Sequence, residues 1–354
     1  MGKIILDCDL MKHPHSGLYH YCLNLGNHVS KLLKSGSSGH RMYYYVPPAE
    51  TGSFHDPSFS IPERKKWHKL FRPFLWDCDI WHAPFQSGRI FPSKGSGTKI
   101  VLTIHDLNCI HEGKPAEEIR KSLAHTQQLI DRADAIVCIS SFCKQDVIDH
   151  CELGTKPVHV IHNGTHQLAE PALGAGSYRP RAPFLFGMGY VNRKKNFHVL
   201  LPLLQESNYE LIIAGKLDEP DYIAHMKSQA MKMGVSDRLH ILGPVSEQEK
   251  SWYMSECLAY LHPSLAEGFG APVVEAMTFG KPVFLSSLTS LPEIGGDVSF
   301  YFRHFSADHM RTVLLEGLNK FKQNGLSDAI RNRASQFNWE TKAEQYLTVY
   351  ESLL

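Results

Sequence analysis

Short aliphatic runs alternate with longer amphipathic stretches along nearly the whole chain, and this alternation restricts the fold more than any other feature. Alternation of this kind predicts right-handed strand–helix–strand units and mostly parallel sheets, an α/β class. In the first half, strands are expected at residues 3–6, 41–46, 80–82, 99–104, 135–139 and 158–161, with helices at 18–33, 117–132 and 141–150.

Residues 163–183 interrupt the pattern, because they are rich in Gly, Pro and Ala and have no periodicity. We interpret this stretch as an interdomain linker, after which the alternation restarts. Strands are expected at 184–187, 209–214, 239–242, 258–261 and 282–285, and helices at 197–204, 220–233, 247–254, 273–279, 307–324, 328–337 and 339–354. Two consecutive doubly wound domains, Rossmann-like and facing a central cleft, are therefore predicted for the 354 residues.

Composition excludes some partners and compartments. The 37 Lys and Arg nearly balance the 36 Asp and Glu, so no overall field draws the protein onto nucleic acid. No apolar run approaches the roughly 20 residues of a membrane span, and the N-terminus is expected to form a strand and not a secretory signal. The eight scattered cysteines indicate reduced thiols in a cytoplasmic protein, with zinc ligation by Cys138 and Cys143 as the alternative.

Residues 64–76 are both basic and aromatic. Such a segment can lie on an anionic bilayer, with its rings in the interface and its cations on the headgroups. Peripheral contact with the inner face of the membrane is the hypothesis, and a solvated basic loop with core aromatics is the alternative.

The most informative segment is HPSLAEGFGAPVVEAM, residues 262–277, in which an expected strand leads through a Gly-rich turn into a helix starting near Pro272. Gly268 and Gly270 give the turn conformational freedom, and its amides with those of the helix start form an anion site. A carboxylate beside a phosphate would repel it, so Glu267 and Glu275 are expected to accept hydrogen bonds from hydroxyls, one from a sugar and one from a ribose. The alternative is a tight turn with a solvated glutamate.

A basic segment, NRKKN at residues 192–196, follows the expected strand 184–187. Fixed cations there would stabilise the negative charge that develops on a departing diphosphate. A solvated basic turn is the alternative.

These segments resemble family 4 of the retaining glycosyltransferases, which have the GT-B fold. EGFGAPVVE at 267–275 fits the E-x7-E pattern of that family, and residues 276–297 continue the likeness. Residues 102–110, 138–148, 160–166, 192–196 and 337–354 resemble further segments of the same family. The resemblance implies transfer of a sugar from a nucleotide-diphosphate sugar to an acceptor hydroxyl with the anomeric configuration kept, without a metal or another cofactor.

The resemblance also implies two domains, residues 1–164 on the acceptor side and 165–338 for the nucleotide sugar, with the helix 339–354 crossing back onto the first. It assigns Lys195 to the donor phosphates, with Arg193 or Lys194 as the companion cation, since Tyr190 stands where many relatives have an arginine. It places His105 near the transferred sugar and gives Asp106 acceptor contact or the orientation of His105; without the resemblance, a strand-end histidine is read as structural. The remaining donor-binding residues are Gly17 near the phosphates, Gly215, Lys216, Val245 and Ser246 around the base, and Gly268, Phe269, Gly270 and Ala271 beside the two glutamates.

The first donor predicted is GDP-mannose and the second UDP-glucose or UDP-GlcNAc, with a growing glycan or a glycolipid as acceptor in surface polysaccharide synthesis. Two alternatives stay open: a GT-B nucleotide-sugar epimerase and a non-catalytic nucleotide-sugar-binding protein. The E-x7-E spacing argues against the epimerase, and the presence of Lys195, Glu267 and Glu275 argues against the non-catalytic protein.

Overall fold

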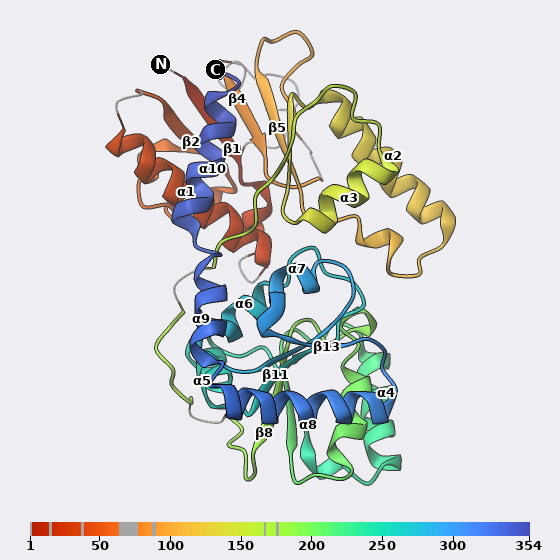
Figure 1. Ribbon diagram of the computed structural model, residues 1–354. Coiled ribbons are helices and arrows are strands. Elements are labelled where there is room, and N and C mark those ends of the chain that lie inside the picture. The colour runs from red at the N-terminus through yellow and green to blue at the C-terminus, as the bar shows by residue number, and fades with distance from the viewer. Residues whose placement is uncertain are drawn as a thin grey trace. The chain divides into compact units, whose positions relative to one another are not determined.

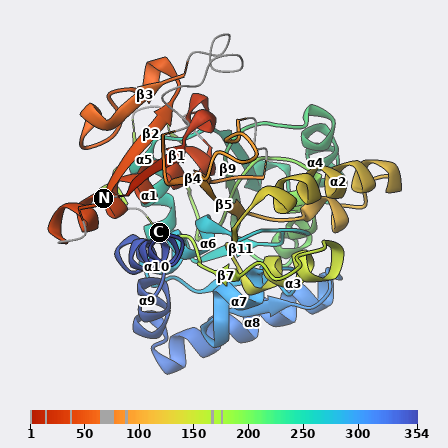
Figure 2. The ribbon, with the colours of Figure 1, turned by 90° about the horizontal axis from the view of Figure 1, so that it is seen from above.

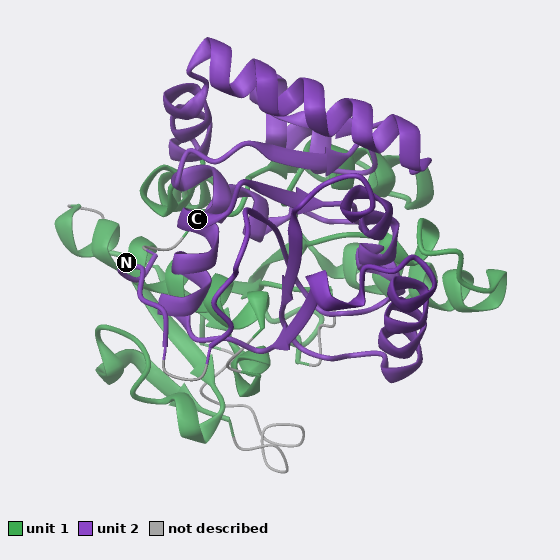
Figure 3. Cartoon of the chain, turned by 90° about the horizontal axis from the view of Figure 1, so that it is seen from below, with its two compact units in different colours: residues 1–166, 337–354 green, residues 167–336 purple. Residues whose placement is uncertain are grey.

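The computed structural model describes residues 2–13, 16–36, 39–63, 77–86, 90–165, 168–174 and 177–354. The chain divides into two compact units, unit 1 (residues 1–166 and 337–354) and unit 2 (residues 167–336), which Figure 3 colours separately. The predicted boundary, between residues 164 and 165, lies in the same stretch. The basic aromatic segment 64–76 lies outside the described residues.

Unit 1 is built on a seven-stranded parallel sheet with the order β3-β2-β1-β4-β5-β6-β7. The strands are β1 Lys3–Asp7, β2 Arg41–Val46, β3 Ser60–Pro62, β4 Ile80–Ala83, β5 Lys99–Ile104, β6 Ala135–Cys138 and β7 Val158–Val160. The direction of winding reverses between β1 and β4, and such a reversal is where open α/β sheets bind ligands.

The helices of unit 1 are α1 Gly17–Ser35, α2 Ala116–Arg132, α3 Ser141–His150 and α10 Trp339–Glu351. Ser16 and Ser140 cap α1 and α3 by accepting hydrogen bonds from backbone amides of the first turn. The C-terminal α10 lies beside α1 (Figures 1 and 2). Its buried side chains Trp339, Tyr346 and Tyr350 join the core formed by α1 and the sheet, so the end of the chain completes unit 1.

Unit 2 contains a six-stranded parallel sheet with the order β10-β9-β8-β11-β12-β13. Its strands are β8 Phe184–Met188, β9 Glu210–Ala214, β10 Leu239–Gly243, β11 Ala259–His262, β12 Val283–Ser286 and β13 Phe300–Phe302. Its helices are α4 Pro220–Lys232, α5 Glu247–Glu256, α6 Ala271–Thr278, α7 Leu291–Gly295, α8 Ala307–Asn324 and α9 Ser327–Ser335. Here the winding reverses between β8 and β11.

Most elements agree with the predicted ranges, and the differences are local. Residues 197–204, predicted as a helix, form a 3-10 helix that contains Pro202. The short elements β3, β13 and α7 were not predicted. β11 runs one residue further than expected, to His262, which places that side chain inside the sheet layer with no exposed surface.

Among the described residues, no helix is both long enough and apolar enough to cross a membrane. All eight cysteines are free thiols. Cys138 and Cys143, the alternative zinc ligands, belong to the core of unit 1, and the Cys143 thiol donates to the carbonyl of Ile104 at 3.3 Å.

Candidate functional site

Three glycines lie at the carboxyl ends of the adjacent strands β8, β9 and β10 in the unit 2 sheet: Gly189 and Gly215 follow their strands, and Gly243 is the last residue of β10. Gly189, Gly215 and Gly243 have φ values of 148°, 136° and 78°, which side-chain-bearing residues rarely adopt. The amide of Gly215 donates to the carbonyl of Gly243 at 2.8 Å, and a Cβ on Gly215 would collide with the carbonyl of Gly189. These strand ends are therefore packed backbone against backbone.

The NRKKN segment forms a short 3-10 helix, η5 (Arg193–Lys195), capped by the Asn192 side chain. It is tied to the turn after β11 by two hydrogen bonds. The amide of Leu265 donates to the carbonyl of Lys194 at 2.8 Å, and Nδ2 of Asn196 donates to the carbonyl of Pro263 at 3.2 Å. The loops on either side of the switch point between β8 and β11 are thus held together.

Lys195 and Glu267, predicted to act on the same donor, meet at this switch point. The Lys195 ammonium pairs with Oε1 of Glu267, and the two side chains are only 13% and 11% exposed. His262 also binds Oε1 of Glu267, through Nε2 at 2.8 Å. Burial on its own would raise the pKa of Glu267, but Lys195 and His262 together hold that pKa well below its ordinary value. Glu267 is therefore a carboxylate at neutral pH, suited to accepting hydrogen bonds and not to donating a proton.

The backbone of Glu267 is fixed by the loop after β12. Its amide donates to Oγ1 of Thr289 at 3.0 Å, and its carbonyl accepts from the Ser290 hydroxyl at 2.9 Å. The turn then passes through Gly270, which has φ 88° at the N-cap of α6, and the helix begins at Ala271, one residue before the expected start near Pro272. Phe269 is buried, with 3% of its surface exposed.

Glu275 lies in α6 and pairs with a lysine that the sequence did not single out. Nζ of Lys250, in α5, lies 3.2 Å from Oε1 of Glu275 and 2.7 Å from Oε2 of Glu247. The Lys250 and Glu275 side chains are 5% and 8% exposed. Burial alone would lower the pKa of Lys250, but the two glutamates raise it above its ordinary value. Lys250 is therefore a charged ammonium at neutral pH.

The other predicted donor-binding residues around this edge have partners of their own. The Arg193 guanidinium lies 3.5 Å from the Glu219 carboxylate and is 66% exposed, and the Lys216 ammonium lies 3.5 Å from Asp218. Ser246 caps α5 in a reciprocal capping box with Glu249, and the Ser246 hydroxyl donates to the Glu249 carboxylate at 2.9 Å. Lys195 is thus the member of the basic segment that pairs with Glu267.

In unit 1, His105 directly follows β5 and is buried. Its Nε2 donates to the carbonyl of Pro84 at 2.8 Å, and the ring lies edge-on to that of Tyr21 at 4.8 Å. Burial lowers the pKa of His105 to about 4, so the ring is neutral near pH 7 and its Nδ1 is the acceptor nitrogen. Neighbouring Asp106 accepts from the amide of Asn108 at 3.0 Å.

Gly17 is the first residue of α1, and a Cβ placed on it would meet no atom of the described residues within 4 Å. The helix start at this position therefore offers a backbone surface that another group can approach closely.

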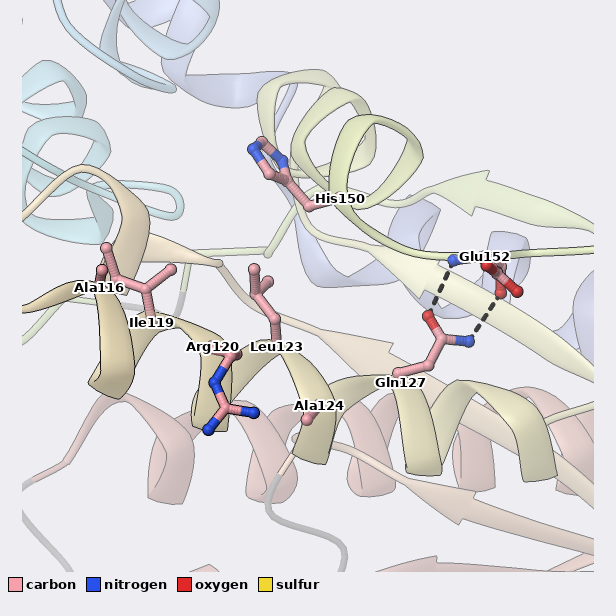
Figure 4. A pocket seen from close by; sticks show the side chains of 8 residues that line it. All are labelled: Ala116, Ile119, Arg120, Leu123, Ala124, Gln127, His150 and Glu152. Carbon is pink, nitrogen blue, oxygen red and sulfur yellow. Dashed lines mark hydrogen bonds between the residues drawn. The ribbon is translucent and has the colours of Figure 1, made fainter.

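An open groove of about 620 Å³ lies elsewhere in unit 1, between α2 and α3 (Figure 4). Gln127 joins its two sides through hydrogen bonds to the backbone of Glu152. None of the predicted site residues lines it. Within the described ranges, no group of three or more His, Cys, Asp or Glu side chains is placed to hold a metal ion.

Two family models match complementary parts of the chain, Glycosyltransferase Family 4 over residues 21–166 and Glycosyl transferases group 1 over residues 178–332. The O-antigen chain mannosyltransferase B of Escherichia coli is 24% identical over 320 residues, covering 82% of this chain and 78% of that protein. The MMP alpha-(1->4)-mannosyltransferase of Mycolicibacterium hassiacum is 27% identical over 225 residues, covering 62% of this chain and 54% of that protein.

Among solved structures, Anabaena HepE in complex with UDP and glucose superposes with a TM-score of 0.75 at 16% identity, over 99% of this chain and 100% of that one. Sucrose-phosphate synthase from Thermosynechococcus elongatus gives a TM-score of 0.76 at 17% identity, over 100% and 99% of the two chains. These likenesses establish the fold of this chain as GT-B.

Proposed function

As the chain belongs to glycosyltransferase family 4, we propose that it transfers a hexose, mannose in the first instance, from a nucleotide-diphosphate sugar to a hydroxyl group of a glycan or glycolipid, with the anomeric configuration kept. The observation that carries this proposal is the pairing of Lys195 with Glu267 at the switch point of the unit 2 sheet. A cation for the diphosphate and an ionised hydrogen-bond acceptor for the sugar are thus in direct contact there.

Lys195 is assigned to the diphosphate. As the bond to the sugar breaks, negative charge grows on the leaving phosphate oxygen, and a buried ammonium stabilises this charge more strongly than one in water does. The Gly189 strand end supports the assignment, because its lack of a Cβ leaves room for the Lys195 side chain that packs against it.

Glu267 is assigned to hydroxyl groups of the transferred sugar, and Glu275 to the ribose. Both are buried carboxylates, and an ionised carboxylate accepts several hydrogen bonds at once. Lys250 forms an ion pair with Glu275 from α5 and does not occupy the diphosphate position.

In the proposed reaction, the acceptor hydroxyl oxygen forms a bond to the anomeric carbon as the bond from that carbon to the diphosphate oxygen breaks. The hydroxyl proton passes to the departing phosphate oxygen on the same face of the sugar. Lys195 donates hydrogen bonds to that phosphate throughout the reaction. The proposed reaction includes no covalent bond between the sugar and a side chain of unit 2. His105 keeps its predicted role as a hydrogen-bonding partner of the sugar, as the acceptor that its neutral ring provides.

The donor class is tested by calorimetric titration with GDP, UDP and dTDP and with their mannose or glucose conjugates. Lys195→Ala should weaken binding of the preferred nucleoside diphosphate by about tenfold or more, because a charge-assisted hydrogen bond is lost. Lys227→Ala, which removes an exposed lysine of α4, is the matched control. Unchanged affinity in Lys195→Ala, or a wild-type protein that binds none of the nucleotides, would refute the proposal.

Transfer itself is tested by incubating GDP-mannose with and without lipid-linked glycan acceptors and determining the anomeric configuration of the product by NMR. An epimerised nucleotide sugar formed without acceptor would identify the epimerase alternative.

Membrane contact through residues 64–76 stays a prediction from the sequence. Binding to anionic liposomes that persists after Lys65, Lys66 and Lys69 are replaced by Ser would contradict it.

A further inference from the structure

His262 is a buried polar residue of the site to which the proposed reaction gives no task. It occupies the last position of β11 and has no exposed surface. Its Nε2 lies 2.8 Å from Oε1 of Glu267, the same oxygen that the Lys195 ammonium binds. Its Nδ1 lies 3.0 Å from the hydroxyl of Tyr260, two residues earlier on the strand.

These contacts fix which ring nitrogen carries the proton. An ionised carboxylate can only accept, so Nε2 must donate to Glu267, and the neutral ring then accepts at Nδ1 from the Tyr260 hydroxyl. Burial lowers the pKa of His262, which agrees with this neutral form. The histidine is therefore a donor aimed permanently at Glu267.

Lys195 and His262 both bind Oε1 of Glu267, and a bound donor substrate would disturb the first of these contacts. A diphosphate beside Lys195 would compete with Glu267 for the N–H donors of the ammonium. Each N–H that turns to the diphosphate no longer reaches the carboxylate. A buried carboxylate left without a partner is strongly destabilised, so every loss of this kind weakens nucleotide binding. A second donor on Glu267 removes most of that cost.

We propose that His262 is a positioning residue for Glu267, holding the carboxylate in place through Nε2–H while Lys195 turns to the diphosphate. The inference rests on the proposed roles of Lys195 and Glu267. Tyr260 belongs to the same unit, because its hydroxyl keeps the proton of the ring on the nitrogen that faces Glu267.

Two amide substitutions separate positioning from simple packing. In His262→Gln, the side-chain amide reaches the position of Nε2 and can still donate to Glu267. In His262→Asn, the shorter amide reaches only the position of Nδ1, so the donor is lost while size and polarity stay similar. The probe is titration with GDP or UDP, whichever the wild-type protein binds more tightly.

His262→Asn should weaken nucleoside diphosphate binding by about tenfold, whereas His262→Gln should stay within about threefold of wild type. Adding Glu267→Gln to His262→Asn should restore the affinity, because no carboxylate then needs a partner when Lys195 moves. A structural role alone predicts neither the difference between the two amides nor the restoration.

Equal affinities in His262→Asn and His262→Gln, or a double variant as weak as His262→Asn, would overturn the inference. If wild type binds the nucleotide and Lys195→Ala does not, while His262→Asn binds like wild type, only the role of His262 fails. If wild type binds no nucleoside diphosphate, the proposed function itself fails. Circular dichroism and thermal unfolding confirm that each variant is folded before its titration is compared.

Discussion

Replacement of Lys250 by Met should destabilise unit 2 although it fills nearly the same space. Lys250 Nζ bridges Glu275 of α6 and Glu247 of α5, at 3.2 and 2.7 Å. Met keeps the aliphatic stem but leaves the 8%-exposed Glu275 carboxylate without its ammonium. Removing one partner of a buried ion pair costs about 3–5 kcal/mol, and the partial access of Glu247 to water places the expected loss near the lower end, about 3 kcal/mol.

A double-mutant cycle isolates this interaction. Urea unfolding of wild type, Lys250→Met, Glu275→Gln and the double variant is followed by tryptophan fluorescence, to which Trp252 in α5 contributes from unit 2. We expect the double variant to recover about 2 kcal/mol relative to the sum of the single losses. Glu247→Gln is the matched control, and because Glu247 is 50% exposed, its loss should stay below about 1 kcal/mol.

The pH dependence of this interaction has a defined sign. The folded-state pKa of Lys250 is raised, so its contribution is fully present below the ordinary lysine value of 10.5 and is lost only as pH rises through the higher folded value. The coupling should therefore be the same at pH 6 and pH 8. A coupling below about 0.5 kcal/mol, or one that disappears between these pH values, would refute the reasoning.

Burial lowers the pKa of His82 to about 3 and that of His105 to about 4, so the unfolded chain takes up more protons than the folded one as the pH falls through 6.5. Unit 1 should therefore lose about 1.6 kcal/mol of stability per histidine between pH 6.5 and 5. Urea unfolding at the two pH values measures this, and a constant or rising stability would contradict it. Tyr346→Phe should destabilise unit 1 by about 1–3 kcal/mol, because the buried Tyr21 hydroxyl loses the Tyr346 hydroxyl that lies 2.5 Å away. The thermal midpoint of unit 1 should fall, with no change in unit 2. Gly215→Ala should weaken nucleoside diphosphate binding and lower the stability of unit 2, because a Cβ there would collide with the Gly189 carbonyl. Titration calorimetry measures the affinity, and a wild-type value would contradict the importance of this packing.

The strands and helices could be predicted closely wherever the local pattern is long and has a clear end. The strand Lys99–Ile104 reads KIVLTI, a mostly aliphatic run, and the helix Ser141–His150 starts after the capping residue Ser140. Both predicted ranges match the structure. β3 and β13 have three residues each, which is too short for any periodicity to appear. The 3-10 geometry of residues 197–204 was not predicted either, since an apolar run with Pro202 inside does not specify which kind of helix forms.

The site divides in the same way between what a motif contains and what the topology adds. Lys195 and Glu267 were each predicted from their own loops, but they are 72 positions apart in the sequence, and the segment between them does not indicate their contact. That contact arises because β8 and β11 are neighbours at the point where the winding reverses. Local sequence patterns place a loop at the end of a strand, whereas the strand order decides which loops meet.

His262 and Lys250 were not predicted as site residues because side chains of their types usually serve simpler purposes. A lysine in the first turns of a helix normally extends into solvent, and a histidine that ends a strand is normally a satisfied core residue. A signal was nevertheless present in both cases: Lys250 lies three residues after Glu247 and three before the buried Tyr253, on the face of α5 turned to the core, and His262 continues a fully buried strand. A buried polar group needs a hydrogen-bond partner and a buried charge needs an opposite charge, and the two glutamates of the E-x7-E motif are those partners here. Each glutamate therefore also holds a buried partner, Lys250 for Glu275 and His262 for Glu267. For this reason, a substitution of either partner that removes its contact should affect nucleotide binding as well as stability.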